Sequence, residues 1–178
     1  MIRLFVALPV PQPTATFLAK LQDGVPGARW TPSERLHVTV RFAGEVSRAA
    51  ADEFDAELET IPGPAVDVQI AGVGAFEEAG APRAIWAGVV VDEPLRILRR
   101  RCEAAARRAG LVPDTRIWKP HVTLAYLNAV DPVRVGRWIQ HNNLARAQPF
   151  RAAAFGLYSS WLSKEGPSYQ LERSYPLA

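Results

Sequence analysis

The sequence predicts an α+β fold with two pseudo-symmetric lobes, each an antiparallel sheet with outer helices, arranged around a central cleft. Two observations indicate this fold. The motif His37–Val40 (HVTV) returns 84 residues later as His121–Leu124 (HVTL), each time with a Trp and a Pro upstream. The order strand, helix, strand, helix, strand also occurs twice along the chain. A duplicated unit packs most simply about a pseudo-two-fold axis, so we expect the two motifs to face one cleft.

The first unit begins with a β-rich run, Ile2–Val10, and continues with a helix over about Thr14–Asp23, which Gly24 ends. The Trp- and His-containing segment follows and alternates apolar and polar residues, as a half-buried strand does. A second helix is expected over Ser47–Ile61, because its apolar residues recur at helical spacing. A third strand over Ala65–Phe76 completes the unit.

The second unit repeats this order, with a strand over Ala84–Val91 and a helix over Pro94–Ala109. Its own His-containing strand comes next. Asp131 and Pro132 are typical of the N-cap and first residue of a helix, which should run to about His141. A third strand over Phe150–Trp161 follows. The tail then predicts a hairpin over Leu157–Tyr175, turning within the stretch SKEGPS, because Gly-Pro favours a turn.

The two units keep nearly the same frame along the chain. Ile85 lies 83 residues after Ile2, and His121 lies 84 residues after His37. No Gly/Ser-rich linker or low-complexity tract separates them. We therefore predict one bilobal domain over residues 1–178, built from a duplicated unit at about 1–80 and 81–178.

Composition narrows the class of protein only moderately. The net charge of +3 favours an anionic partner slightly, although a solvated basic face gives the same value. A single cysteine, Cys102, excludes an internal disulfide and a Cys-rich zinc site. The apolar run Leu4–Val10 is too short to span a membrane and has no cleavage site after it. We expect a cytoplasmic monomer that does not engage membranes.

The repeated motif places chemically useful side chains on one face of each strand. Residues i and i+2 of a strand point to the same side, so His37 and Thr39 should project together. His121 and Thr123 should do the same in the second unit. A single histidine in an apolar strand is usually structural, and two histidines without further ligands are a weak metal pattern. The matched pair instead favours one joint site.

Two imidazoles across a phosphate suit in-line displacement at phosphorus. One can remove a proton from the attacking oxygen while the other donates a proton to the leaving oxygen. The ordinary pKa of histidine, near 6.5, allows both roles close to neutral pH. The threonine hydroxyls can donate hydrogen bonds to the non-bridging oxygens. This chemistry needs no metal and no other cofactor.

Both motifs and several longer segments resemble the two-histidine phosphoesterase superfamily, and more narrowly the RNA 2',3'-cyclic phosphodiesterases, historically called 2'-5' RNA ligases. The similar segments extend along the chain and include RLFVALPVP, RWTPSERLHVTVRFAGEV, GVGAF, PRAIWAGV, WKPHVTLA and GPSY. The resemblance implies metal-independent hydrolysis of a terminal RNA 2',3'-cyclic phosphate to a 2'-phosphate. Some members of the family also join tRNA halves through a 2'-5' linkage, so tRNA halves are among the expected partners.

The resemblance also implies a role for each motif residue. His37 would be the proton donor to the departing 3' oxygen, and His121 would be the proton acceptor that activates water. Thr39 and Thr123 would hold the phosphate.

One position departs from the family pattern. Family members often carry an arginine five residues after the second histidine, where this chain has Tyr126. Simple alternation places Arg41 on the face of His37, so Arg41 is the predicted phosphate-binding cation. The same alternation turns Phe42 and Tyr126 away from the histidines, and they would flank a nucleobase only if a bulge intervened. Lys119 is close enough in sequence to His121 to contact a substrate phosphate.

Other functions stay open at this point. The same chemistry could act on a small cyclic nucleotide, an ADP-ribose cyclic phosphate or a 2'-5' oligonucleotide. The chain could also be an RNA-end-binding module without turnover, which the basic composition permits.

Overall fold

The structure is a computed structural model that describes residues 1–178. Its strands are β1 (Ile2–Pro9), β2 (Arg29–Trp30), β3 (His37–Val46), β4 (Val66–Val68), β5 (Ile70–Glu78), β6 (Ala81–Val89), β7 (His121–Tyr126), β8 (Phe150–Ala152), β9 (Ala154–Ser163) and β10 (Gly166–Pro176). Its helices are α1 (Gln12–Ala19), α2 (Arg48–Glu59), α3 (Glu93–Arg108) and α4 (Pro132–Asn142), with a 3₁₀ turn at Ser33–Arg35. The predicted α+β class with antiparallel sheets is confirmed. None of the helices combines the length and apolar character needed to cross a bilayer.

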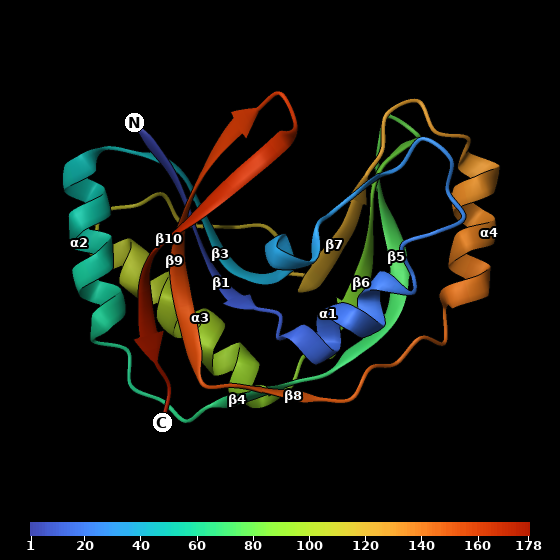
Figure 1. The fold of residues 1–178 in the computed structure, drawn as a ribbon. Helices are drawn as coiled ribbons and strands as arrows, with labels where there is room; N and C mark the ends of the chain where they lie inside the picture. The colour runs from blue at the N-terminus through green and yellow to red at the C-terminus, as the bar shows by residue number, and fades with distance from the viewer.

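The main sheet is symmetric about its centre. Its strand order is β10-β9-β1-β3-β7-β6-β5, and β3 and β7 run antiparallel. They meet at a single residue pair, Val38 and Val122, each of which directly follows its histidine. Because equivalent residues pair here, a local two-fold axis passes between them and brings the two motifs together. Figure 1 shows the sheet folded sharply at this point, with β1, β3, β9 and β10 on one side and β5, β6 and β7 on the other.

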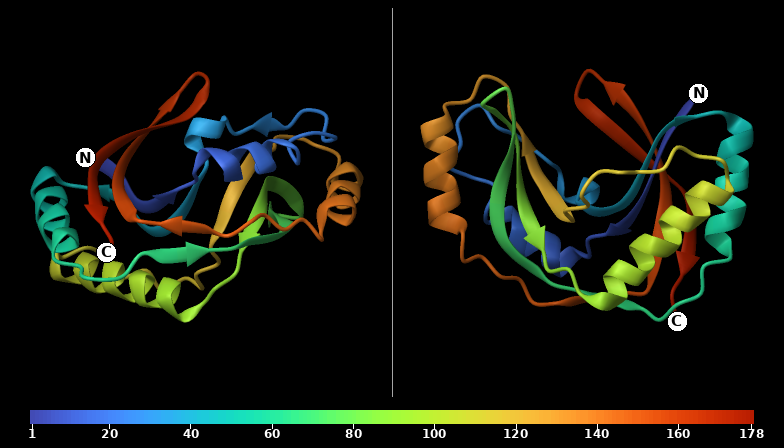
Figure 2. Two further views of the ribbon diagram at one scale, coloured as in Figure 1. Left: turned by 60° about the horizontal axis from the view of Figure 1, so that its bottom comes forward. Right: turned by 180° about the vertical axis from the view of Figure 1, so that it is seen from behind.

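The helices cover the outside of the folded sheet. In Figure 1, α2 and α4 lie at opposite ends of the molecule. Seen from behind in Figure 2, α3 crosses in front of the sheet on the α2 side. The predicted inward residues of α3, including Leu95 and Cys102, are buried, and Asp92 caps the helix by accepting a hydrogen bond from the Leu95 amide at 3.0 Å. Asp131 caps α4 as predicted, accepting from the Val133 amide at 2.9 Å.

The third strand of each unit differs from its prediction. Each is broken into two strands, because its two parts pair with different partners. The parts β5 and β9 join the main sheet, whereas β4 and β8 pair with each other in a separate two-stranded sheet. At the first break, the Gln69 amide donates hydrogen bonds to the carbonyls of Ile70 and Ala147. The small sheet crosses between the two ends of the molecule (Figure 2).

Three boundaries also differ. The first helix begins two residues earlier than predicted, after Pro11, and ends at Ala19, with turns before Gly24. The tail hairpin is confirmed, but its turn is shorter, because Gly166 and Pro167 already pair in β10. The predicted 83-residue frame between the first strands is wrong. Ala7 faces Thr39 and Trp86 faces Thr123, so the equivalent residues of β1 and β6 are 79 apart.

Candidate active site

Matching β-bulges shape the two central strands beyond their histidines. In β3, Thr39 and Arg41 pair with the consecutive residues Ala7 and Val6, so Val40 is the extra residue. In β7, Thr123 and Ala125 pair with consecutive residues of β6, so Leu124 is extra. A bulge inserts one residue and therefore reverses the alternation of side chains beyond it. As a result Phe42 and Tyr126 face the same side as the histidines.

The bulges and the central pairing together create one cleft. His37, Thr39, His121 and Thr123 all line a single cavity of about 440 Å³. Phe42 and Tyr126 line it too, and so do further residues from β1, β2, β9 and β10: Arg3, Phe5, Arg29, Ser160, Leu162, Pro167 and Tyr169. The structure therefore brings together the four motif residues that the sequence singles out.

The two imidazoles are oriented by the same hydrogen bond. Nδ1 of His37 donates to the backbone carbonyl of Arg35 at 2.7 Å, and Nδ1 of His121 donates to that of Lys119, also at 2.7 Å. A carbonyl only accepts, so each Nδ1 carries the hydrogen. Each neutral ring therefore has an unprotonated Nε2 available for proton transfer in the cleft.

The surroundings lower the pKa of both histidines below the usual 6.5. For His37 the main cause is burial; the Arg35 carbonyl works against it, and the facing His121 adds to it. For His121 the main cause is again burial, opposed by the carbonyl of Lys119 and reinforced by the Lys119 ammonium. At neutral pH the empty cleft thus holds two neutral rings. An anion between them would raise both pKa values by favouring the charged form.

Aromatic rings fix each imidazole from the side. The ring of Tyr169 meets His37 edge-on, with 5.1 Å between ring centroids, and Phe5 lies 5.0 Å from His37. Phe76 meets His121 edge-on at 4.8 Å, and Trp86 lies 6.1 Å from it. Of these four rings, the sequence analysis assigned no role to any. Tyr169 belongs to the GPSY segment, which was noted only for its resemblance to a family.

The predicted position of Arg41 is wrong, and the bulge at Val40 is the reason. Arg41 is 3% exposed and points away from the cleft. Its Nε donates to Glu103 on α3 at 2.5 Å, and its Nη2 donates to the Val112 carbonyl at 2.7 Å. Arg41 therefore attaches β3 to α3 and cannot reach a phosphate between the histidines.

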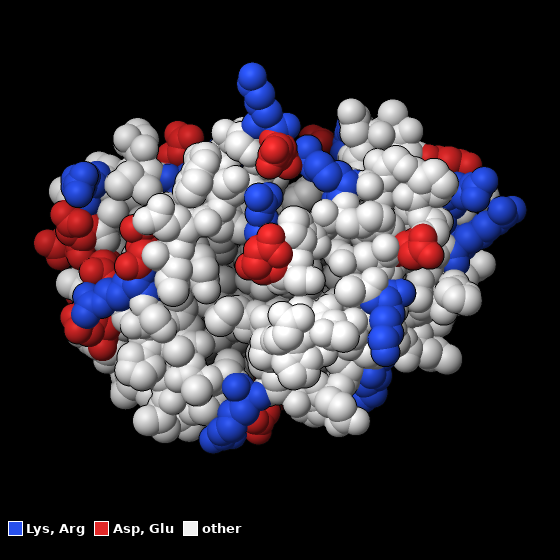
Figure 3. Space-filling view, viewed as in Figure 1, with Lys and Arg blue, Asp and Glu red and all other residues white.

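Other cations lie at the cleft. Arg29 lines it from β2, with its guanidinium carbon 5.8 Å from the centre of the Tyr126 ring. Lys119 lies beside His121 in an adjoining pocket, with Nζ 4.6 Å from the Trp86 ring centroid. Sequence reasoning missed Arg29, because only the pairing of β2 with β7 places it opposite Tyr126. On the face shown in Figure 3, acidic side chains are interspersed among the basic ones, so the positive charge is not gathered in one large patch.

No three His, Cys, Asp or Glu side chains converge in a way that could hold a metal ion. The donors in the cleft are two imidazoles and hydroxyls, which suit proton transfer and hydrogen bonding to an anion. Whether the reaction is metal-free stays a prediction.

An antiparallel α+β fold with two facing His-x-Thr strands is typical of the two-histidine phosphoesterases. The chain belongs to the 2'-5' RNA ligase superfamily, whose family model matches residues 10–160. The resemblance noted from the sequence is thereby confirmed.

Named relatives agree with this assignment. An RNA 2',3'-cyclic phosphodiesterase of Aeropyrum pernix is 30% identical, with 86% of this chain and 90% of the relative covered. One of Archaeoglobus fulgidus is 27% identical, with 95% and 97% covered. Among solved structures, apo LigT of E. coli matches with a TM-score of 0.80 at 20% identity, covering 99% of this chain and 98% of LigT. LigT in complex with 3'-AMP matches with a TM-score of 0.77 at 21% identity over the same shares of the two chains.

Proposed function

We propose that this protein hydrolyses the 2',3'-cyclic phosphate at an RNA end to a 2'-phosphate, without a metal. The observation that carries the proposal is the pair of imidazoles that line one cavity, each with Nδ1 bound to a backbone carbonyl and Nε2 free. The relatives named as RNA 2',3'-cyclic phosphodiesterases support the choice of substrate.

In this reaction the two histidines have complementary tasks. His121 accepts the proton of the attacking water, and the new P–O bond forms as the bond from phosphorus to the ribose 3' oxygen breaks. His37 protonates that departing oxygen on the opposite side. His37 must therefore be charged when it acts, and the phosphate anion favours that charge against the effect of burial.

The remaining cleft residues bind the substrate. Thr39 and Thr123 donate hydrogen bonds to the non-bridging oxygens, where negative charge must be stabilised. Phe42 and Tyr126, which the bulges turn toward the cleft, flank the nucleobase of the terminal nucleotide. Lys119 adds positive charge on the side of the attacking water.

We further propose that the two halves of the chain, about 1–80 and 81–178, are equivalent lobes around this cleft. The symmetric strand order, the Val38–Val122 pair and the matching bulges support this arrangement. Each lobe then supplies one histidine and one threonine. Replacement of water by the 5'-hydroxyl of a second RNA would form a 2'-5' linkage through the same groups, which is how ligation would occur.

The deciding experiment uses a short RNA that ends in a 2',3'-cyclic phosphate, with EDTA present, and identifies the product. We expect a 2'-phosphate from the wild type and a loss of roughly 10²- to 10⁴-fold in turnover for His37→Ala and for His121→Ala. His141→Ala is the matched control, because His141 is the third histidine and lies exposed on α4.

Full activity in either motif variant would contradict the proposed roles. Tight binding of the RNA end without any product would instead indicate a binding module. Turnover confined to 2'-5' linked or small cyclic substrates would keep the chemistry and change the substrate.

A further inference from the structure

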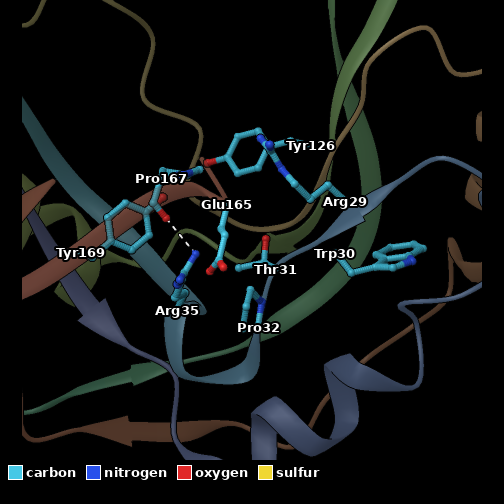
Figure 4. Close-up of a pocket in the computed structure, with 9 residues that line it drawn as sticks. All are labelled: Arg29, Trp30, Thr31, Pro32, Arg35, Tyr126, Glu165, Pro167 and Tyr169. Carbon is cyan, nitrogen blue, oxygen red and sulfur yellow. Dashed lines mark hydrogen bonds between the residues drawn. The ribbon is translucent and has the colours of Figure 1, made fainter. Parts of the chain in front are cut away.

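A small side pocket opens off the cleft beside the tip of the β9–β10 hairpin. Figure 4 shows it enclosed by β2, the 3₁₀ turn, the end of β7 and the hairpin. Four of its residues also line the cleft, namely Arg29, Tyr126, Pro167 and Tyr169. The five others are Trp30, Thr31, Pro32, Arg35 and Glu165. The side pocket and the cleft are therefore continuous.

Two arginines in the side pocket have no acidic partner. Most arginines of the chain form ion pairs, but Arg29 and Arg35 belong to none of them. Arg35 donates one hydrogen bond, from Nη1 to the Pro167 carbonyl at 2.9 Å (Figure 4). Arg29 is held over the Tyr126 ring. A guanidinium has five N–H donors, so both side chains keep donors available for an anion.

A third group in the side pocket also has no partner. The hydroxyl oxygen of Thr31 is buried and makes no hydrogen bond. A buried polar atom without a partner is uncommon in folded proteins and calls for an explanation. A ligand in the side pocket is one that would also use the two arginines.

The position of the side pocket relative to His37 indicates which part of a substrate reaches it. This step rests on the proposed function, in which His37 protonates the ribose 3' oxygen. The ribose then lies on the His37 side of the phosphate. Arg35 orients His37 through its carbonyl, and Tyr169 contacts the His37 ring. Both residues line the side pocket, so the RNA chain leaves the cleft toward it.

We propose that the side pocket binds the phosphate on the 5' oxygen of the terminal nucleotide, through Arg29 and Arg35. This phosphate joins the terminal nucleotide to the rest of the RNA and is absent from a nucleoside 2',3'-cyclic phosphate. The preferred substrate is then an RNA end, and a single nucleoside cyclic phosphate is a poorer one. Glu165 lines the same space and opposes the anion, so it limits the preference.

The test compares kcat/KM for three substrates. These are cytidine 2',3'-cyclic phosphate, the same compound with a 5'-phosphate, and a CpC dinucleotide that ends in the cyclic phosphate. We expect the 5'-phosphate alone to raise kcat/KM roughly tenfold, the size expected for charge-assisted hydrogen bonds from arginine. The KM of both phosphate-bearing compounds should also rise more steeply with salt, since a bound phosphate releases counterions.

Three variants locate the effect. Arg35→Ala should remove most of the gain from the 5'-phosphate, and its turnover of cytidine 2',3'-cyclic phosphate reports whether the variant has folded. Glu165→Gln should enlarge the gain, a result that misfolding does not produce. Arg134→Ala is the matched control, because Arg134 is an exposed arginine on α4 without an ion pair, and its gain should equal that of the wild type.

Equal kcat/KM for the first two substrates in the wild type would overturn the proposal and leave the proposed function intact. A gain that survives both Arg29→Ala and Arg35→Ala, or that appears only with the dinucleotide, would also overturn it. Absence of turnover with all three substrates would instead overturn the proposed function, and this inference with it.

Discussion

His37 and His121 have similar surroundings, and this similarity fixes how activity should depend on pH. Both rings donate from Nδ1 to a carbonyl two residues earlier, and burial lowers both pKa values below 6.5. The pH dependence of kcat/KM reports the free enzyme, in which the base must be neutral and the acid protonated. Because both pKa values are lowered, we expect a bell-shaped profile with its maximum below pH 6.5. A maximum of kcat/KM above pH 7 would contradict this assignment.

Lys119 allows a finer test at the same scale. Its ammonium contributes to the lowered pKa of His121, whereas its backbone carbonyl orients the ring. Lys119→Gln removes the charge and keeps the carbonyl, so the pKa of His121 should rise. We expect the acid limb of the kcat/KM profile to move to higher pH, while the limb that belongs to His37 stays in place. An unchanged acid limb would show that another group titrates there.

The sequence predicts four of the cleft residues because period-two alternation holds from each histidine to its threonine. It fails three residues beyond each histidine, where Val40 and Leu124 form bulges. A bulge depends on pairing with a neighbouring strand and leaves no mark on a simple apolar–polar pattern. Arg41 was misplaced for this reason, and the cleft-facing position of Phe42 required the same bulge.

Among the elements, α3 and β3 are joined by a largely buried ion pair. The side chains of Arg41 and Glu103 are 2% and 15% exposed, and Glu103 also accepts from Arg107 and from the Asp114 amide. Although burial acts in the opposite direction, the bonds from Arg107 and Arg41 hold the pKa of Glu103 below its usual 4.5. The stabilisation is therefore complete above pH 4.5 and is lost as pH falls through the lowered pKa.

Removal of this carboxylate should be costly, because it leaves the Arg41 charge buried without a partner. We expect Glu103→Gln to lower the free energy of unfolding by about 3 kcal/mol. Glu45→Gln is the matched control, since Glu45 pairs with Arg3 at 3.8 Å on the surface and should cost less than about 1 kcal/mol. Denaturant unfolding at pH 7 measures both values. Equal costs would mean that the buried pair does not stabilise the fold.

The elements that the sequence predicts best are those with local determinants. The N-caps Asp92 and Asp131 and the apolar faces of α3 and α4 need no distant contact to be recognised. The third strands were predicted as continuous because each is β-rich throughout. Their breaks arise where β4 and β8 leave the main sheet to pair with each other, which is a tertiary choice between distant segments.

At the scale of the whole molecule, the two halves of the chain are joined at several places. The strands β3 and β7 pair at the centre, and β4 pairs with β8. The indole of Trp138 on α4 donates to the Leu21 carbonyl at 2.8 Å, and that of Trp118 donates to the Thr39 carbonyl at 3.2 Å. One apolar cluster of 38 buried residues includes side chains from both halves. The active cleft lies on this junction, so its geometry depends on the halves remaining together.

These connections should make unfolding a single event. Residues joined by one core and by shared sheet hydrogen bonds lose their structure together, because exposing one half removes the partner of the other. We expect one calorimetric transition with an enthalpy of about 125 kcal/mol, from roughly 0.7 kcal/mol per residue near 60 °C. The van't Hoff enthalpy should equal the calorimetric one. Two transitions of about half that enthalpy each would mean that the halves fold independently, and a substitution at β4 or β8 would then shift only one of them.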